Sequence, residues 1–256
     1  LTEGTAPTVI GVSTTKVSCT LEQYGDFVQP SDLLIMTAID NQIESAVDLL
    51  GYRAAITIDT RIRNGLLGTS SVPSGAKLPL QYWHSNTSSG FVGTLSGILP
   101  AMTADLNNVK QAAFNLRRLN VRPFSDGNYV MVAHPNVVRD LESDTTWTSW
   151  NQYQAKETMW KGEVGRIFGV RIVESTNMYS TTSGAGASAT AYFSPVFGQG
   201  CYAVTEIDGG TKMFIKNPND YDTANPLNQW STVGFKATFA TQVLHTSAGV
   251  ILVTAD

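Results

Sequence analysis

A stripe of apolar residues with helical spacing constrains the fold of this chain more than any other feature. The stripe recurs every three or four positions and consists of Ile35, Ile39, Ile43, Val47, Leu50, Ala54, Ile58 and Ile62. Such spacing predicts one amphipathic helix over about 31–66. Ser31 is a favoured N-cap, Asp32 complements the positive end of the helix dipole, and Gly51 is a candidate kink. Unbroken, this helix would be about 50 Å long, which is unusual for a globular domain.

The chain is long enough for a substantial core but carries few charges. Its 256 residues suffice for one large domain or two smaller ones. Charged residues make up 15%, against roughly 25% in an average soluble domain. Two interpretations stay open: other protein chains cover much of the surface, or the surface is merely rich in Ser, Thr and Asn. The net charge of -4 gives no electrostatic footprint for nucleic acid or an anionic membrane.

Targeting and redox signals are few. No apolar run approaches the roughly 20 residues of a membrane span, and no signal peptide is visible. Because the sequence opens at Leu1 without a methionine, we expect that a leading segment is missing or removed. The two cysteines, Cys19 and Cys201, lie far apart and in no metal-ligand spacing. They fit reduced cytosolic thiols better than a disulfide framework.

Strands and connections occupy most of the remaining chain. Residues 1–29 predict an extended arm or hairpin, with a β-rich stretch over 12–20, and 68–100 predict a long connection with short strands. The sequence Asp208-Gly209-Gly210 predicts a hairpin turn between two strands. Strands are expected near 129–133, 170–174, 189–193, 201–206, 211–216, 232–245 and 249–254.

Two further helices complete the predicted elements. One spans 103–119, with Thr103 as its N-cap and an apolar face of Leu106, Val109, Ala113, Leu116 and Leu119. The other is short, begins with Pro135 and reaches about Glu142. The fold class is therefore α+β, with one dominating helix.

Three histidines and a group of glycines are the main hints of an active site. His84, His134 and His245 lie in no metal-binding spacing. His134 follows an apolar strand and precedes Pro135, so we interpret it as a strand-end residue that helps to cap the next helix. The glycines form no phosphate-binding motif and lead into a strand, which favours turn and bulge positions for Gly162, Gly165 and Gly169. The sequence predicts no catalytic, cofactor or metal site.

Two groups of residues are candidates for contacts with other chains. Asp40, Glu44 and Asp48 place like charges at i,i+4 spacing, which fits either a docking face for basic groups of a neighbouring chain or a solvated face. Trp147 and Trp150 fit either an interface anchor or core packing.

Four segments carry a resemblance to a known family. They are residues 1–7, 21–28, 129–141 and 162–175, and the last of these, GEVGRIFGVRIVES, is the most specific. Together they resemble the major capsid proteins of tailed bacteriophages, and most closely the capsid family typified by the coliphage N-four. The resemblance runs in order over about residues 1–175.

The resemblance implies a Hong Kong 97-type capsid fold, with an extended loop, a peripheral domain built on a long spine helix, and an axial domain around a central sheet. The N-terminal arm and the first strand of the loop would be absent from this sequence. The implied division is 1–29 for the extended loop and return strand, 30–100 for the peripheral domain, 101–200 for the axial domain, 201–230 for peripheral strands and 231–256 for C-terminal strands of the axial domain.

The implied function is structural and not enzymatic: a shell subunit that forms hexamers and pentamers with copies of itself, in the virion, around double-stranded DNA that it does not read. Portal, scaffolding and decoration proteins are further candidate partners, and assembly would take place in the bacterial host cytoplasm. An encapsulin-like nanocompartment shell is the alternative. A hydrolase is disfavoured because no G-x-S-x-G elbow is present. The candidate inter-subunit contacts are Lys16, Tyr24, Asp40, Glu44, Asp48, Trp147 and Trp150.

Some capsids of this fold join a loop lysine covalently to an asparagine of the next subunit. Lys16 would be the donor here and Asn217 or Asn219 the acceptor. The spacing of these residues does not itself indicate such a cross-link.

Overall fold

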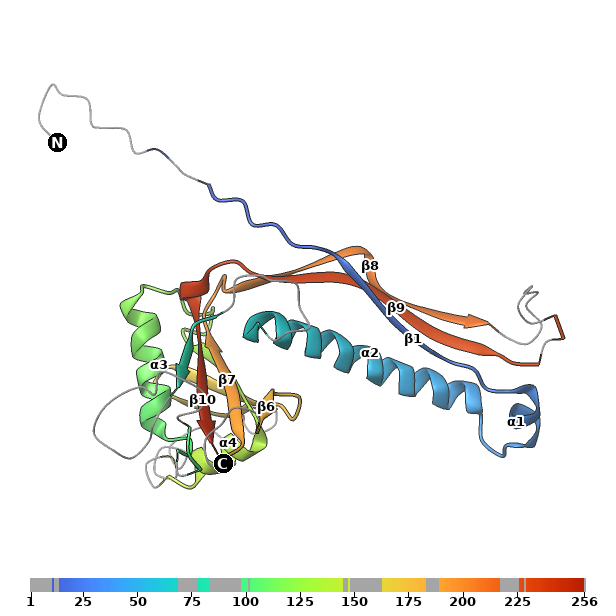
Figure 1. The fold of residues 1–256 in the computed structure, drawn as a ribbon, viewed down its shortest axis with the longest axis horizontal. Helices are drawn as coiled ribbons and strands as arrows, with labels where there is room; N and C mark the ends of the chain where they lie inside the picture. The colour runs from blue at the N-terminus through green and yellow to red at the C-terminus, as the bar shows by residue number, and fades with distance from the viewer. Residues whose placement is uncertain are drawn as a thin grey trace, which may run out of the picture.

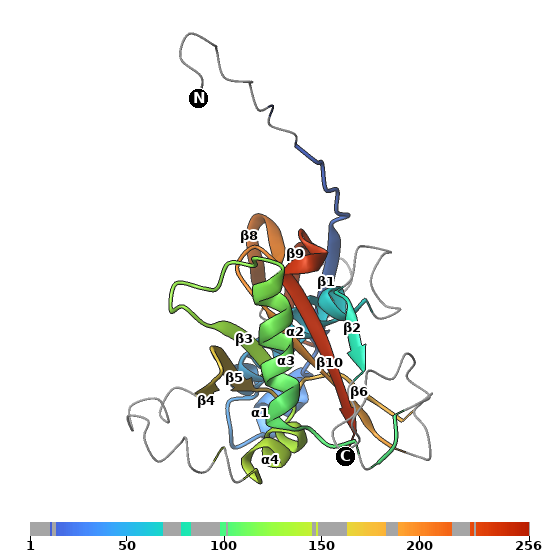
Figure 2. The same ribbon diagram turned by 90° about the vertical axis from the view of Figure 1, so that its left-hand side faces the viewer.

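A long helix under a narrow sheet projects from a second, broader sheet with its own helices (Figures 1 and 2). The computed structural model describes residues 11, 14–68, 78–82, 98–100, 102–144, 147, 163–182, 189–216, 226–227 and 229–255. The projecting part, here called the peripheral unit, contains α1 (Asp32–Thr37), α2 (Gln42–Leu67), β1 (Glu22–Val28), β8 (Tyr202–Lys216) and β9 (Thr232–Val243).

The second part, here called the axial unit, is built on a sheet with the strand order β2-β10-β7-β3-β5-β4, and β6 pairs with β7. Parallel pairs join β3 to β5 and β10 to β2, while the other pairs are antiparallel. Its elements are β2 (Leu80–Tyr82), α3 (Leu106–Arg118), β3 (Tyr129–Ala133), α4 (Pro135–Glu142), β4 (Glu163–Ile167), β5 (Val170–Glu174), β6 (Ser180–Thr181), β7 (Ala191–Phe197) and β10 (Gly249–Ala255).

The long helix is divided near its start, which corrects the expectation of one helix over 31–66. Ser31 does cap α1, because its side chain accepts a hydrogen bond from the Leu34 N–H. The chain then turns extended at Ala38, and Asn41 caps α2 by accepting from the Glu44 N–H. The break lies here, and α2 continues unbroken through Gly51. Its 26 residues give a length of about 39 Å.

The peripheral unit is held together by one face of α2 against β9. Leu50 is fully buried and Ala46 and Ala54 are nearly so, and they pack against Val233 and Phe235 of β9. These five are all the buried residues of the cluster between the helix and its sheet in the described part of the chain. The peripheral unit therefore has a thin core.

The three-stranded sheet has the order β1-β9-β8, with both pairs antiparallel. The expected hairpin at 208–210 is wrong: β8 is one continuous strand, and both of its halves pair with β9. A shift in register between Glu206 and Thr211 absorbs the extra residues as a bulge. Gly210 has a φ of 76°, a conformation that favours glycine.

Two expected domain boundaries also need correction. Residues 231–256 were expected to form axial strands, but β9 in this range is the central strand of the peripheral sheet. Only β10, the other strand of the range, joins the axial sheet. β2 lies within 30–100 yet pairs in parallel with β10. At the start of the chain, the regular strand is β1, and residues 14–20 form an extended segment without regular pairing.

The axial core lies on both faces of its sheet. One cluster joins α3 and α4 to the sheet through residues such as Leu116, Met131 and Ile172. The other includes Leu66 and Leu67 of α2, which anchor the end of the long helix in the axial unit. The predicted helix over 103–119 starts later than expected: Asp105, not Thr103, supplies the N-cap. Leu119 at its end is exposed, not part of the apolar face.

Candidate functional site

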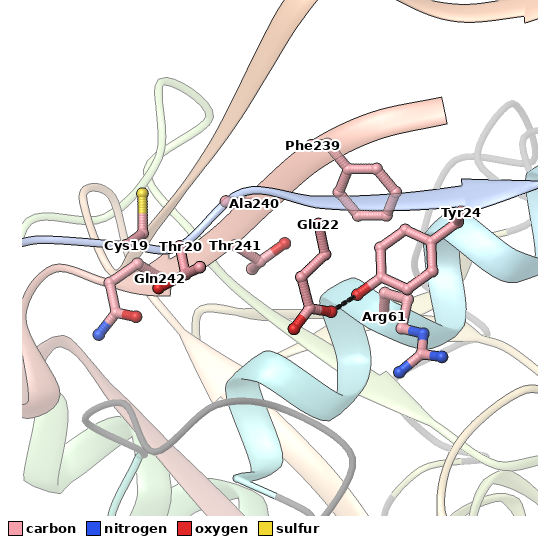
Figure 3. Close-up of a pocket in the computed structure, with 9 residues that line it drawn as sticks. All are labelled: Cys19, Thr20, Glu22, Tyr24, Arg61, Phe239, Ala240, Thr241 and Gln242. Atoms are coloured by element: carbon pink, nitrogen blue, oxygen red, sulfur yellow. Dashed lines mark hydrogen bonds between the residues drawn. The ribbon is translucent and has the colours of Figure 1, made fainter. Parts of the chain in front are cut away.

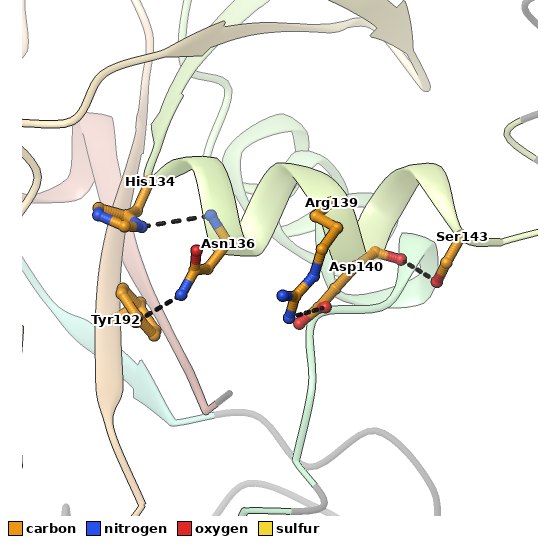
Figure 4. Close-up of polar contacts among 6 residues, drawn as sticks. All are labelled: His134, Asn136, Arg139, Asp140, Ser143 and Tyr192. Carbon is orange, nitrogen blue, oxygen red and sulfur yellow. Dashed lines mark hydrogen bonds and ion pairs between the residues drawn. The ribbon is translucent and has the colours of Figure 1, made fainter.

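His134 is a helix cap, as the sequence predicts (Figure 4). Its Nδ1 accepts a hydrogen bond from the Asn136 N–H at 3.2 Å, and its ring lies 4.8 Å from that of Tyr192. The Asn136 amide donates to the Tyr192 hydroxyl at 2.8 Å. These contacts fix the start of α4 against β7. His134 thus holds two elements together and has no nucleophile or carboxylate among the contacts described for it.

The glycines of the 162–175 block are turn and bulge positions where the structure describes them. Gly169 has a φ of 79° in the turn between β4 and β5, beside Phe168 at 53°. A register shift between Glu163 and Gly165 marks a bulge. Gly162 lies outside the described residues, as do His84, Asn217 and Asn219.

The described residues contain no group of three or more His, Cys, Asp or Glu side chains that could hold a metal ion. Burial raises the pKa of the Cys201 thiol to about 11, which suits an inert core residue. Cys19 is free and exposed. No helix in the described part of the chain is long and apolar enough to cross a membrane.

Tyr24 lies between the sheet and the long helix (Figure 3). Its hydroxyl donates a hydrogen bond to Glu22, and the Arg61 guanidinium lies 4.5 Å from the centre of its ring. The pocket beside it has a volume of only about 40 Å³, far below the roughly 300 Å³ of a small-molecule site. Nearby, Arg53 forms an ion pair with Asp26 at 2.7 Å. These contacts fasten β1 to α2.

Burial, followed by the hydrogen bond to Glu22, raises the pKa of Tyr24 from 10.0 to about 12. Because the folded protein holds this proton more tightly than the unfolded chain does, the contribution of Tyr24 to stability is complete below pH 10. It is lost as the pH rises from about 10 to about 12.

We therefore expect β1 to loosen in that alkaline range, and Tyr24→Phe to reduce this pH dependence. Hydrogen exchange of β1 as a function of pH, compared between wild type and variant, measures the effect. Equal alkaline loosening in both proteins would show that Tyr24 is not its source.

The acidic residues predicted to make contacts share one stretch of surface. Asp40, Glu44 and Asp48 are all exposed, and they lie at and just after the break between α1 and α2. Lys16 is exposed in the extended segment that precedes β1. The structure therefore brings the three carboxylates together, while Lys16 lies at a separate place on the chain.

The two tryptophans have different outcomes. Trp147 is 4% exposed and belongs to the axial core, so core packing describes it and the interface role does not. Trp150 lies outside the described residues.

A junction between the two units was not foreseen from the sequence. The Asn177 side chain donates to Asp59 at 2.6 Å and to the Thr60 hydroxyl at 3.0 Å, and it accepts from Arg63 at 3.2 Å. Arg63 also donates to the Asn177 carbonyl. Burial lowers the pKa of Arg63. One asparagine of the axial unit thereby bonds three residues of α2.

Exposed apolar side chains gather on the peripheral unit and the segment before it. They were missed because Ile39 continues the apolar stripe and others lie within helices and strands, where apolar residues normally indicate a core. The exposed large residues there are Val17, Leu21, Phe27, Leu33, Leu34, Met36, Ile39, Leu49, Tyr52, Ile56, Val204, Met213, Phe214 and Ile215. So many exposed apolar side chains on one part of a molecule are typical of surfaces that another protein covers.

Comparison with known proteins points to one family. The model of a phage capsid protein family matches residues 14–251. The solved capsid of Ralstonia phage GP4 matches with a TM-score of 0.70 at 14% identity, covering 93% of this chain and 74% of that one. The acid-stable capsid of Helicobacter pylori bacteriophage KHP30 matches at 0.65 and 12% identity, covering 93% and 76%.

A further solved structure bears on the nanocompartment alternative. The SrpI encapsulin complex from Synechococcus elongatus PCC 7942 matches with a lower TM-score of 0.54 at 9% identity, covering 91% of this chain and 73% of that one. No curated protein sequence matches the chain. At these identities the solved structures establish the fold, which is the Hong Kong 97 type expected from the sequence.

Proposed function

The chain belongs to the phage capsid protein family, and from this we propose that its copies form the hexamers and pentamers of an icosahedral head around the double-stranded DNA of a tailed phage. The exposed apolar surface of the peripheral unit carries the proposal. A thin helix–sheet layer that exposes residues such as Leu33, Met36 and Phe27 is suited to burial against neighbouring copies. The location that follows from the family is the virion.

Assembly, not chemistry, is the proposed role of the molecule. The contacts of His134 and Tyr24 fasten elements to one another, and the family is a structural one. We further propose that the 14–21 segment, the 40–48 acidic stretch and the peripheral sheet meet neighbouring subunits. Portal, scaffolding and decoration proteins are proposed as additional partners, and the bacterial cytoplasm as the place of assembly.

An encapsulin-like compartment is the second candidate, favoured by the shared fold with the SrpI encapsulin. The two functions differ in what the shell contains. A phage head made in its host contains nuclease-protected double-stranded DNA, whereas a nanocompartment contains a host enzyme.

The test is the assembly state of the purified protein over a range of concentrations. We expect sedimentation velocity to show a cooperative change from small species to one large closed particle as the concentration rises. A species that remains monomeric at every concentration would contradict the proposal. Particles that contain an enzyme and no protected DNA would favour the nanocompartment.

A further inference from the structure

The outer face of the peripheral sheet, opposite α2, carries two phenylalanines on either side of a glycine. In the strand register, Gly234 of β9 is opposite Phe27 of β1 and also opposite Phe214 of β8. Directly opposed residues of an antiparallel pair point to the same face. The neighbours Val233 and Phe235 are buried toward α2, so Phe27 and Phe214 point outward, where they are 62% and 51% exposed.

The backbone approaches closely around the two glycines of this face. A Cβ on Gly234 would lie 3.2 Å from the Cβ of Phe27, and one on Gly25 would lie 2.7 Å from the Phe235 carbonyl oxygen. The missing side chains leave an open groove of about 420 Å³ across the three strands, lined in part by both phenylalanines, Lys216 and Lys236. The groove is here called the outer groove.

Three lysines lie in or beside the outer groove. Lys236 of β9 is directly opposite Lys212 of β8 and on the same face as Gly234, two residues away. Like charges in directly opposed positions disfavour each other. Lys216 at the end of β8 adds a third positive charge at the edge of the groove. The face therefore combines an aromatic notch with a cluster of cations.

A complementary surface, in which exposed apolar side chains lie beside carboxylates, is found at the corner between α1 and α2 of the same unit. Leu33, Met36 and Ile39 are among the most exposed apolar side chains described, and Ile39 is fully exposed. Asp40, Glu44 and Asp48 follow directly. This stretch, 33–48, is here called the acidic corner.

We propose that the acidic corner of one copy binds the outer groove of a second copy; this inference rests on the proposed function as a shell subunit. Ile39 and Met36 enter the notch between Phe27 and Phe214, an environment that suits aliphatic and thioether groups. The carboxylates then lie against the lysines. Glu44 and Asp48 are about 6 Å apart along the helix, close to the roughly 5 Å between opposed residues of neighbouring strands.

A second copy of the chain as the binding partner accounts for both the outer groove and the acidic corner. Nucleic acid as the partner does not. Phosphates would be attracted to the lysines but would leave Ile39 and Met36 exposed to water. They would also be repelled by the carboxylates of this unit. The outer groove and the acidic corner differ from each other, so the contact is head-to-tail, the kind of contact that builds a ring when the rotation between copies closes. Both surfaces involve the distal end of the peripheral unit, where β8 ends and α1 lies (Figure 1).

A charge exchange tests the pairing. Lys212→Glu with Lys236→Glu, and separately Glu44→Lys with Asp48→Lys, should each raise the concentration needed for assembly at least about ten-fold, because like charges then face each other across the contact. The chain that carries all four changes should assemble again near the wild-type concentration. Mixed with wild type, it should form separate shells, since each mixed contact places like charges together.

Substitution of a single exposed apolar residue tests the same contact without changing any charge. Ile39→Ser should weaken assembly while leaving thermal unfolding of the subunit unchanged, because the side chain is fully exposed in the subunit. Leu99→Ser, at an exposed leucine of the axial unit, is the matched control.

The outcomes separate this pairing from the function it rests on. Suppose that the wild-type chain forms shells and that neither pair of charge reversals, nor Ile39→Ser, changes assembly. That result would overturn the pairing and leave the proposed function standing. The same conclusion follows if the variant with all four charge changes still fails to assemble near the wild-type concentration. Reversals of the lysines that leave the shells intact but lower their DNA content would assign the outer groove to DNA instead. A wild-type protein that never assembles would overturn both.

Discussion

Leu50→Ala should release α2 from the peripheral sheet and abolish shell assembly. Leu50 is 0% exposed and is one of the five buried residues that the described part of the chain places between the helix and β9. Loss of its side chain leaves a cavity that costs about 2–5 kcal/mol. The thin peripheral core has few other contacts to offset that cost, whereas the axial core does not include this residue. Hydrogen exchange should therefore increase in α2 and β9 and remain low in β3, β5 and β7.

Leu49→Ala is the matched control, because the neighbouring leucine is 53% exposed. Its substitution should leave exchange in α2 within the small range typical of surface changes. If Leu50→Ala leaves α2 as protected as in wild type, the peripheral unit does not depend on this cluster. If it destabilises both units equally, the two units unfold together and the expected confinement of the effect to α2 and β9 is wrong.

Asn177→Ala should loosen the junction between the units without unfolding either of them. The substitution removes the amide contacts to Asp59, Thr60 and Arg63. It leaves the half-buried Arg63 with fewer acceptors, at a cost of about 2 kcal/mol. That loss corresponds to a decrease in Tm of about 4–8 °C for a chain of this size. Because Leu66 and Leu67 still anchor α2 in the axial core, we expect a wider range of angles between the units and shells of uneven size.

Small-angle scattering of the unassembled subunit and electron micrographs of the shells measure these two effects. Thr57→Ala is the control, since the Thr57 hydroxyl donates to the Arg53 carbonyl one turn earlier in the same helix, at 2.8 Å. Uniform shells with a wild-type Tm from Asn177→Ala would show that the asparagine does not set the angle between the units.

The long helix was predictable because its apolar stripe is strictly periodic, but its break was not. Ile39 continues the period of the stripe and yet is fully exposed, because it lies between the end of α1 and the start of α2. Asn41 is the signal that could have shown the break, because an asparagine followed three residues later by Glu44 is a favourable start for a helix. Its side chain does accept from the Glu44 N–H.

The path of the C-terminal strands shows a limit of local patterns. Asp208-Gly209-Gly210 has the composition of a hairpin turn, and its local sequence does not distinguish a turn from a bulge. The distinction comes from β9, whose 12 residues pair with β8 on both sides of the irregularity. The strand pairing is decided by a distant partner, so neither the bulge nor the place of β9 in the peripheral sheet follows from the local sequence.

The cap at His134 was predictable, whereas the junction at Asn177 was not. Pro135 restricts the backbone to a helix start, which assigns the preceding residue to the N-cap. Asn177 contacts Thr60 across a separation of 117 residues, and nothing in its local sequence indicates that partner. The acidic residues 40–48 were recognisable as a docking face or a solvated face, and their position beside exposed apolar residues now favours docking.

Electron cryomicroscopy of particles assembled from the purified chain tests the central claim most directly. The account predicts closed shells built from rings of five and six copies, with the distal ends of the peripheral units in contact with neighbouring copies. Particles without such rings, or a protein that stays monomeric at every concentration, would contradict it.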